Sequence, residues 1–283
     1  MISIEKMEIL VISLPLDLER REVLRTRFPR RFKDFKIVPA LDFRNGLPPA
    51  LFSMTRFCKR NYRNPLSPPE IGCSLSHMKA YETFLSGSAS HALILEDDVL
   101  GSDLGIDEIE RAITYLEDDA FLLCGGQQGL RNTRYLYGWQ QGEKLYRLPR
   151  LVVRFTARTC CYVVTRKRAA KLLAQQRSCL DRADNWKRLL SDCTNIFFMQ
   201  ALAHPQESNS SHIDSMRISR SRDGVWRMLL ADGVFVTLSN QIVKIFIRST
   251  ARWRNLRRPP RFVADIRVSR GRPDSSSASD QWQ

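Results

Sequence analysis

The sequence predicts an α/β fold with a doubly wound, mostly parallel sheet flanked by helices. Short apolar runs bounded by turn residues alternate along the chain with longer amphipathic stretches, and this alternation is typical of sheets covered by helices on both faces. The chain has 283 residues, which is enough for one large domain of this kind and a smaller appendage.

The first strand, helix and second strand are predicted within residues 7–40. Met7–Leu14 contains a short apolar run, which is typical of a buried strand. A helix is expected to begin near Asp17, because acidic residues in a first turn interact favourably with the helix dipole. Phe35–Ala40 is the next apolar run and predicts the second strand.

A long loop and then a well-marked helix are predicted next. Residues 41–66 contain Asn-Gly and Pro-Pro pairs and are expected to form the loop. Ser67 suits the N-cap of the helix, Pro68 suits its first position, and Glu70 completes a capping box. This capping role is sufficient to explain Glu70.

Apolar runs and amphipathic stretches continue to alternate further along the chain. The expected elements are strands at Ala92–Leu95, Ala120–Cys124 and Tyr162–Thr165, helices at Ile106–Leu116 and Lys167–Leu173, and two shorter elements at Trp186–Leu190 and Ile196–Gln200. This order of elements favours the doubly wound sheet.

Three consecutive acidic residues, Glu96-Asp97-Asp98, directly follow the run Ala92–Leu95. Ligands of open α/β sheets bind at the carboxyl ends of the strands. Adjacent carboxylates are costly to bury, and a divalent cation such as Mg²⁺ or Mn²⁺ removes that cost. The sequence therefore predicts a metal site for a phosphorylated substrate, the alternative being a solvated acidic loop. The similar string Leu116–Asp119 ends a helical pattern and is more simply a solvated turn.

Two strings of the sequence, Ser67–His77 (SPPEIGCSLSH) and Ala92–Val99 (ALILEDDV), resemble glycosyltransferase family 25. This family contains the lipopolysaccharide and lipooligosaccharide glycosyltransferases. The resemblance covers about residues 7–215, and Ser13 stands where the family usually has Asn. Further similarities lie at Leu10–Leu14 with Arg20-Arg21 and at Tyr162–Leu173, and looser ones at Asp184–Trp186 and His204–Ile213.

The resemblance implies a GT-A-like fold that binds a nucleotide-diphosphate sugar and a divalent metal. Glu96-Asp97-Asp98 corresponds to the Asp-x-Asp-like element of the family. Asp98 and Glu96 are therefore expected to bind Mn²⁺ or Mg²⁺, and Asp97 and Glu96 to contact the donor. The implied reaction moves a hexose, galactose or glucose, from a UDP-sugar to a lipooligosaccharide or lipopolysaccharide core acceptor. A metal suits it because charge develops on the leaving diphosphate.

The resemblance also implies inversion of the anomeric centre in a single displacement. A general base then takes the proton of the acceptor hydroxyl. Asp184 is the expected base and, together with Asp98, the expected catalytic residue, with Asp192 and Glu207 as alternatives. An N-cap of the following helix explains Asp184 equally well.

Three further residues are expected to bind the donor: Ser13, Arg20 and His77. His77 would hydrogen-bond a diphosphate or sugar hydroxyl, although a packing role is equally consistent with its helix. Arg20 would pair with phosphate, the alternative being a solvated helix face. Trp139 and Trp186 are candidates for stacking on acceptor sugars, but tryptophans at such positions are more often part of the core.

The chain is strongly basic, and the excess is concentrated at its end. It contains 45 Lys and Arg against 30 Asp and Glu, a net charge of +15. Residues 217–283 contain 14 Lys or Arg and 5 Asp, a net charge of +9. We expect a glycosyltransferase domain at 1–215 and a basic amphipathic extension at 216–283, with about ten disordered residues at its end. Such an extension suits an anionic membrane surface, or is simply solvated.

Compartment and rival functions follow from the same features. The seven cysteines contain no Cys-x-x-Cys and are expected to be reduced and buried. The sequence shows no signal peptide and no apolar stretch of membrane-spanning length, so a cytoplasmic protein is expected, peripheral on the inner membrane.

Two other functions are compatible with the sequence: a nucleic-acid-binding protein that uses the basic tail, and a metal phosphohydrolase that uses Glu96–Asp98. No specific nucleic-acid partner is expected, because no recognisable module is present.

Overall fold

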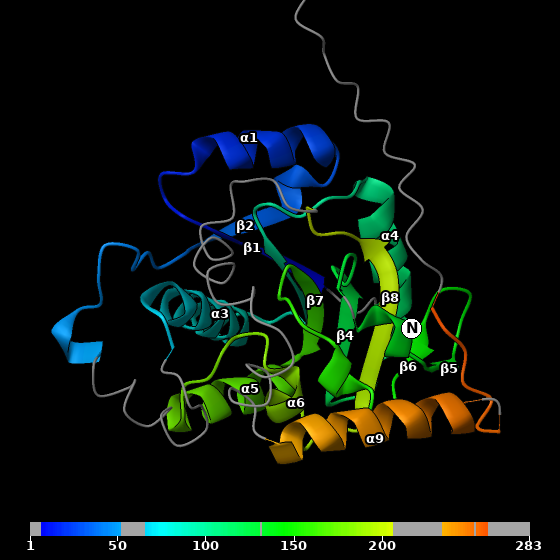
Figure 1. The fold of residues 1–283 in the computed structure, drawn as a ribbon. Helices are drawn as coiled ribbons and strands as arrows, with labels where there is room; N and C mark the ends of the chain where they lie inside the picture. Colours follow the sequence, from blue (N-terminus) through cyan, green and yellow to red (C-terminus); the bar gives the residue numbers. More distant parts are fainter. Residues whose placement is uncertain (1–6, 52–65, 131, 206–233, 252, 260–283) are drawn as a thin grey trace, which may run out of the picture.

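The structure is a computed structural model whose fold is built on one eight-stranded sheet, in the order β2-β1-β3-β7-β4-β8-β6-β5 (Figure 1). It describes residues 7–51, 66–130, 132–205, 234–251 and 253–259. The strands are β1 (Met7–Ser13), β2 (Phe35–Pro39), β3 (His91–Glu96), β4 (Ala120–Gly125), β5 (Trp139–Gln140), β6 (Tyr146–Arg147), β7 (Cys161–Thr165) and β8 (Asn195–Leu202).

The sheet is mixed, because β7 runs antiparallel to the strands on both sides of it. Strand β1 pairs in parallel with β2 and β3, and β4 pairs in parallel with β8. Strand β7 lies antiparallel between β3 and β4, and β6 pairs antiparallel with both β8 and β5. All strands except β6 and β7 therefore run in the same direction, so the α/β class and the mainly parallel sheet are confirmed.

Helices cover both faces of the sheet, because alternate strand residues point to opposite sides. Ile9 and Val11 of β1 belong to the apolar cluster of α1 and α4, whereas Leu10 and Ile12 belong to that of the remaining helices. The helices are α1 (Leu18–Arg27), α3 (Pro68–Ser86), α4 (Asp103–Ala112), α5 (Arg166–Ser178), α6 (Trp186–Leu189) and α9 (Val234–Thr250). Short 3₁₀ helices lie at Phe32–Asp34, Pro49–Leu51, Ile113–Tyr115, Thr133–Tyr135 and Val153–Phe155.

Helix α3 begins where the sequence predicts. The backbone N–H and the hydroxyl of Ser67 both donate to the Glu70 carboxylate at 2.9 Å, and the reciprocal bond of the capping box is also present. Glu70 additionally forms an ion pair with Arg182 at 3.1 Å. The capping box therefore fixes the start of a helix whose first turns border the cavity described below.

Several sequence predictions fall on residues outside the described ranges. The boundary between 1–215 and 216–283 lies within 206–233, and the expected disordered end lies within 260–283. Of the described cysteines, Cys124, Cys160, Cys161 and Cys193 are buried as expected, whereas Cys73 and Cys179 are only half-buried. None of the six forms a disulfide, and Cys58 lies outside the described ranges. In the described part of the chain, the helices lack the combination of length and apolar character that crossing a membrane requires.

Candidate active site

A cavity of about 260 Å³ opens at one edge of the sheet. The carboxyl ends of β1 and β3 reach this edge, and His204, which follows β8, also lines the cavity. Because β7 is antiparallel to β3, residues that precede β7 reach the same edge as residues that end β3. Arg158 and Thr159 therefore line the cavity next to Glu96, and residues of α3 also line it.

Glu96, the last residue of β3, is held by hydrogen bonds from two directions. The Thr159 hydroxyl donates to its Oε1, and His77 Nε2 lies 3.5 Å from the same oxygen. Burial raises the pKa of Glu96, whereas His77, Thr159 and His204 lower it, and its pKa is lowered overall. Glu96 is therefore a carboxylate at neutral pH.

Asp97 points toward α1. Its carboxylate is only 7% exposed and accepts a hydrogen bond from Arg20 Nη1 at 2.9 Å. Burial raises its pKa, and bonds from Arg20 and Ser13 act in the opposite direction without cancelling that effect. This ion pair ties the first helix to the turn after β3. Both Arg20 and Ser13, two of the residues expected to bind the donor, line the cavity beside it.

Asp98 is the least compensated of the three acids. Its Oδ1 is buried and has no hydrogen-bond partner among the described residues, and its Oδ2 lies 3.9 Å from His204 Nε2. Burial, followed by repulsion from Glu96, raises the pKa of Asp98 to about 6. A buried and partnerless carboxylate oxygen beside a second carboxylate is the arrangement that a divalent cation relieves.

Glu96, Asp98 and His204 together fit a metal ion. Each offers one ligand atom, and these atoms all lie within 4.8 Å of one another. The sequence predicted the two acids as ligands but assigned no role to His204. An antiparallel bridge between Leu100 and Ala203 places His204 next to the acids, and this contact spans about a hundred residues of sequence.

Asp184 lines the same cavity. Its Oδ2 accepts a hydrogen bond from the backbone N–H of Arg158 at 3.3 Å. The N-cap of α6 is Asn185, so the capping alternative for Asp184 is wrong. Of the alternative bases, Asp192 does not line the cavity, because it pairs with the buried Arg168 at 2.8 Å. Glu207 lies outside the described residues.

His77 is buried on α3, only 2% exposed, and its two ring nitrogens have different partners. Nδ1 lies 2.8 Å from the Tyr162 hydroxyl, and Nε2 faces Glu96. The packing role and the functional role expected for His77 therefore coexist, since one side of the ring is fixed by the core and the other borders the cavity.

The remaining candidates have structural roles. Trp186 is fully buried and packs on Phe121 with ring centroids 4.6 Å apart, so stacking on an acceptor sugar is wrong for it. Trp139 lies on β5 and donates to the carbonyl oxygen of Arg254 at 3.0 Å, away from the cavity lining. In the second acidic string, Glu117 and Asp118 are exposed as expected of a solvated turn, whereas Asp119 pairs with Lys171 and with the buried Arg168, each at 2.6 Å. None of these three residues lines the cavity.

The family comparison agrees with this geometry. The model of glycosyltransferase family 25 (LPS biosynthesis protein) matches residues 6–186, more than half of the chain. The matched region contains the three acids after β3 and Asp184, and His204 lies beyond it. No curated protein matches the chain. The chain belongs to glycosyltransferase family 25, and it is a glycosyltransferase of lipopolysaccharide biosynthesis.

Proposed function

We propose that the chain is an inverting, metal-dependent hexosyltransferase that uses a UDP-sugar as donor. The sugar would be galactose or glucose, and the acceptor a lipooligosaccharide or lipopolysaccharide core. The observation that carries this proposal is the pair Glu96 and Asp98 in the cavity, with one Asp98 oxygen buried and partnerless among the described residues.

Glu96, Asp98 and His204 would hold the metal ion. When bound, Mn²⁺ or Mg²⁺ supplies positive charge that stabilises the departing nucleoside diphosphate. Two carboxylate oxygens and one imidazole nitrogen suit Mn²⁺ better than Mg²⁺, because magnesium strongly prefers oxygen ligands. We therefore propose Mn²⁺ as the preferred ion.

Donor binding would depend on residues next to the acids. Arg20 brings a guanidinium group to the cavity and is oriented by Asp97, so it would attract an anionic donor without moving on binding. Ser13 lies at the carboxyl end of β1, where nucleotides bind in open α/β sheets. His77, held by Tyr162, would hydrogen-bond the diphosphate or a sugar hydroxyl.

Asp184 would act as the general base. Inversion in one step requires the acceptor hydroxyl to attack the face of the sugar opposite the diphosphate, so the base belongs on the acceptor side. Asp184 comes from the segment before α6 rather than from the β3 edge, and the N–H of Arg158 orients its carboxylate. It would take the hydroxyl proton as the glycosidic bond forms.

A thermal-shift panel of nucleotide sugars tests the proposed donor. We expect one UDP-sugar to raise the melting temperature in the presence of Mn²⁺ and to have little effect without it, because metal and diphosphate bind together. Stabilisation by no nucleotide sugar would contradict the proposal. Release of phosphate or nucleotide without any sugar acceptor would instead favour the phosphohydrolase rival.

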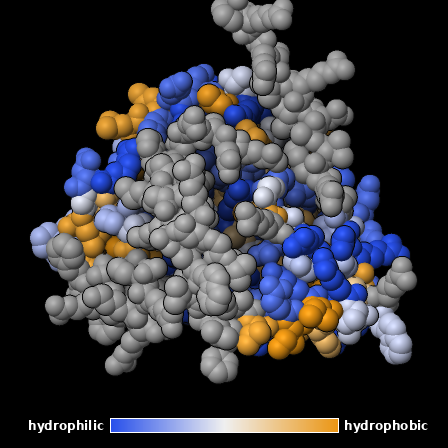
Figure 2. Space-filling model, viewed as in Figure 1, coloured by the Kyte–Doolittle hydropathy of each residue, from blue (hydrophilic) through white to orange (hydrophobic). Residues whose placement is uncertain are grey.

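We also propose that helix α9 contacts an anionic membrane surface, where a glycolipid acceptor would lie. One side of α9 packs on the protein through Val243 and Ile247. The opposite side is apolar and exposed, and Figure 2 shows its hydrophobic side chains along α9 at the bottom of the view. We call these four residues the outer face: Leu238 (53% exposed), Ile242 (65%), Ile245 (68%) and Phe246 (41%).

The positive charge around the outer face indicates what kind of surface would bind to it. Residues 234–259 contain six Lys or Arg and no acidic residue, and Trp253 beside the helix is 95% exposed. An apolar helix face with basic and aromatic neighbours is typical of helices that lie in the interface of an anionic bilayer.

Replacing Ile242 and Ile245 by Gln should weaken vesicle binding by about tenfold or more. Both side chains are exposed in the free protein and would be buried in lipid on binding, so the double variant loses that apolar contact. Co-sedimentation with phosphatidylglycerol-containing vesicles measures this. Leu104→Gln is the matched control, since Leu104 is 70% exposed on α4 and should not affect binding. Equal binding by the double variant and the wild type, or equal binding to neutral phosphatidylcholine vesicles, would contradict the proposed contact.

A further inference from the structure

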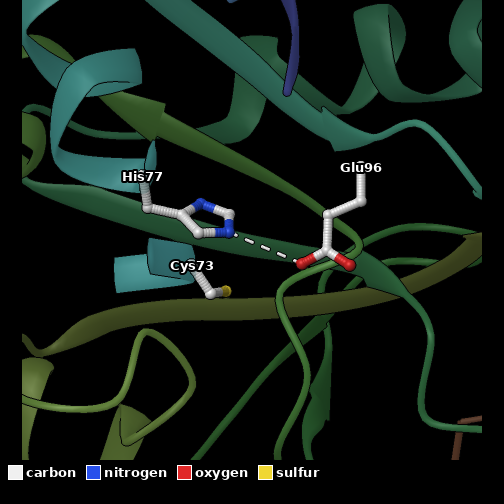
Figure 3. A group of neighbouring side chains, drawn as sticks. All are labelled: Cys73, His77 and Glu96. Atoms are coloured by element: carbon white, nitrogen blue, oxygen red, sulfur yellow. Dashed lines mark ion pairs between the residues drawn. The ribbon is translucent and has the colours of Figure 1, made fainter. Parts of the chain in front are cut away.

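We propose a second cation site in this chain, formed by Cys73, His77 and Glu96 and selective for thiophilic divalent ions such as Zn²⁺. Cys73 and His77 are four residues apart on α3, so their side chains share one face of the helix. Glu96 approaches them from the end of β3. One ligand atom from each residue lies within 4.8 Å of the others (Figure 3).

The hydrogen bond at Nδ1 of His77 directs the other ring nitrogen, Nε2, toward Glu96. The Tyr162 hydroxyl donates its single proton to the Tyr81 hydroxyl at 3.0 Å. It must therefore accept from Nδ1–H of His77, which lies 2.8 Å away. Nε2 then faces the Oε1 atom of Glu96 at 3.5 Å. A metal ion bound between these two atoms would take the place of the proton that they share without it, and Nε2 of the neutral ring would then offer its lone pair to the ion.

This hydrogen-bond pattern is the one found around metal-binding histidines. A ligating imidazole usually donates its other N–H to a fixed partner, which sets the tautomer and orients the ring. Tyr162 is fully buried and supplies that partner here. The His77 ring is thus oriented before any ion binds.

The arrangement differs from that of a nucleophilic cysteine. In Cys–His–carboxylate triads the thiol and the carboxylate contact opposite nitrogens of the imidazole. Here Glu96 faces Nε2, the Cys73 sulfur lies on that same side of the ring (Figure 3), and Nδ1 is occupied by Tyr162. The three groups converge as ligands do around an ion.

The donor set determines the class of ion. A thiolate with an imidazole and a carboxylate suits Zn²⁺ or Cd²⁺, whereas Mg²⁺ prefers oxygen ligands alone. On binding, the Cys73 thiol would lose its proton to solvent and the sulfur would bond to the ion. The cavity that Cys73 and His77 line gives the ion access. Glu96 also belongs to the group proposed to hold Mn²⁺, so the two sites would compete for one carboxylate.

Titration of the metal-free full chain with Cd²⁺ tests the site, followed by the ultraviolet charge-transfer absorption of a thiolate bound to cadmium. We expect saturable absorption that is lost in Cys73→Ser and strongly reduced in His77→Gln. Tyr162→Phe should weaken Cd²⁺ binding by about tenfold, because the second-shell bond to Nδ1 is removed. Zn²⁺ should displace Cd²⁺, and the same concentration of Mg²⁺ should not.

Two controls make the titration specific. Cys179→Ser replaces another half-buried cysteine, which lies at the end of α5, and should keep the full absorption. Asp98→Asn alters the proposed Mn²⁺ site and should also keep it. Absorption that persists in Cys73→Ser, or its absence from the wild type, would overturn the proposal. Circular dichroism verifies that each variant is folded, and the assay needs no sugar donor, so its outcome is independent of the proposed transferase reaction.

Discussion

Asp98→Asn should abolish Mn²⁺-dependent binding of the UDP-sugar and reduce sugar transfer by about a thousandfold or more. Asn has nearly the same shape, but it lacks the negative charge that holds a divalent ion, and stabilisation of the leaving diphosphate is among the largest contributions to such a reaction. Isothermal titration with Mn²⁺ and UDP measures the loss of binding. A transfer assay measures the loss of activity.

The second acidic string provides the matched control. Asp118→Asn makes the same chemical change in an exposed turn outside the cavity, and we expect it to leave both measurements unchanged. Mn²⁺-stimulated transfer that is undiminished in Asp98→Asn would rule out Asp98 as a ligand.

In the metal-free protein the same substitution should increase stability. Burial and the neighbouring Glu96 raise the pKa of Asp98 to about 6, so between about pH 4 and pH 6 the folded state binds more protons than the unfolded state. The free energy of unfolding therefore falls as the pH rises through this window, and Asn removes that loss. At pH 7 we expect Asp98→Asn to be more stable by about 1–3 kcal/mol, and below pH 4 the difference should disappear. Chemical denaturation at both pH values tests this, and a destabilised variant at pH 7 would contradict it.

Asp184→Asn should lower kcat by about 10²–10⁴ and leave the affinity for the donor unchanged. The carboxylate would act only on the proton of the acceptor hydroxyl, and losing a general base has effects of this size. The amide oxygen of Asn can still accept the hydrogen bond from Arg158, so the local structure should be retained. Steady-state kinetics with acceptor, together with UDP binding, separate the two effects.

Asp192→Asn is the control for the base. Asp192 lies outside the cavity lining and pairs with Arg168 and Lys171. Its substitution should reduce stability and leave kcat per folded molecule near normal. Near-normal turnover in Asp184→Asn would show that Asp184 is not the base.

Local patterns in the sequence predicted those parts of the site that depend on neighbouring residues. The capping box of Ser67 and Glu70 needs only four consecutive positions, and the structure shows it as expected. The acids after β3 were predicted because a buried strand and its end lie in one short string. What precedes each acidic string distinguishes the two: Glu96, Asp97 and Asp98 line the cavity, and Leu116–Asp119 does not.

Long-range contacts could not be predicted in the same way. Nothing local to Cys161–Thr165 shows that β7 lies antiparallel between β3 and β4, and this placement is what brings Thr159 to Glu96. His204 reaches Asp98 only through the bridge of Leu100 to Ala203. Residues 127–158, which show no clear strand pattern, contain β6, which pairs with β8, and β5, which pairs with β6.

The sequence left alternatives open for Asp184 and for Trp186, and the tertiary structure bears on both. The residues around Asp184 fit either a helix cap or a base, and the structure assigns the cap to Asn185 and places Asp184 at the cavity. Trp186 fits either a sugar platform or the core, and its contact with Phe121 buries it completely. Both outcomes depend on how far the α6 segment is buried in the folded protein. The spacing of apolar residues in the sequence does not predict this.

Anomalous diffraction at the manganese absorption edge, from crystals grown with Mn²⁺ and UDP, tests the proposed mechanism most directly. We expect one strong anomalous peak bounded by Glu96, Asp98 and His204, with the UDP diphosphate beside it. A cavity without manganese, or a peak bound at a different place, would contradict it.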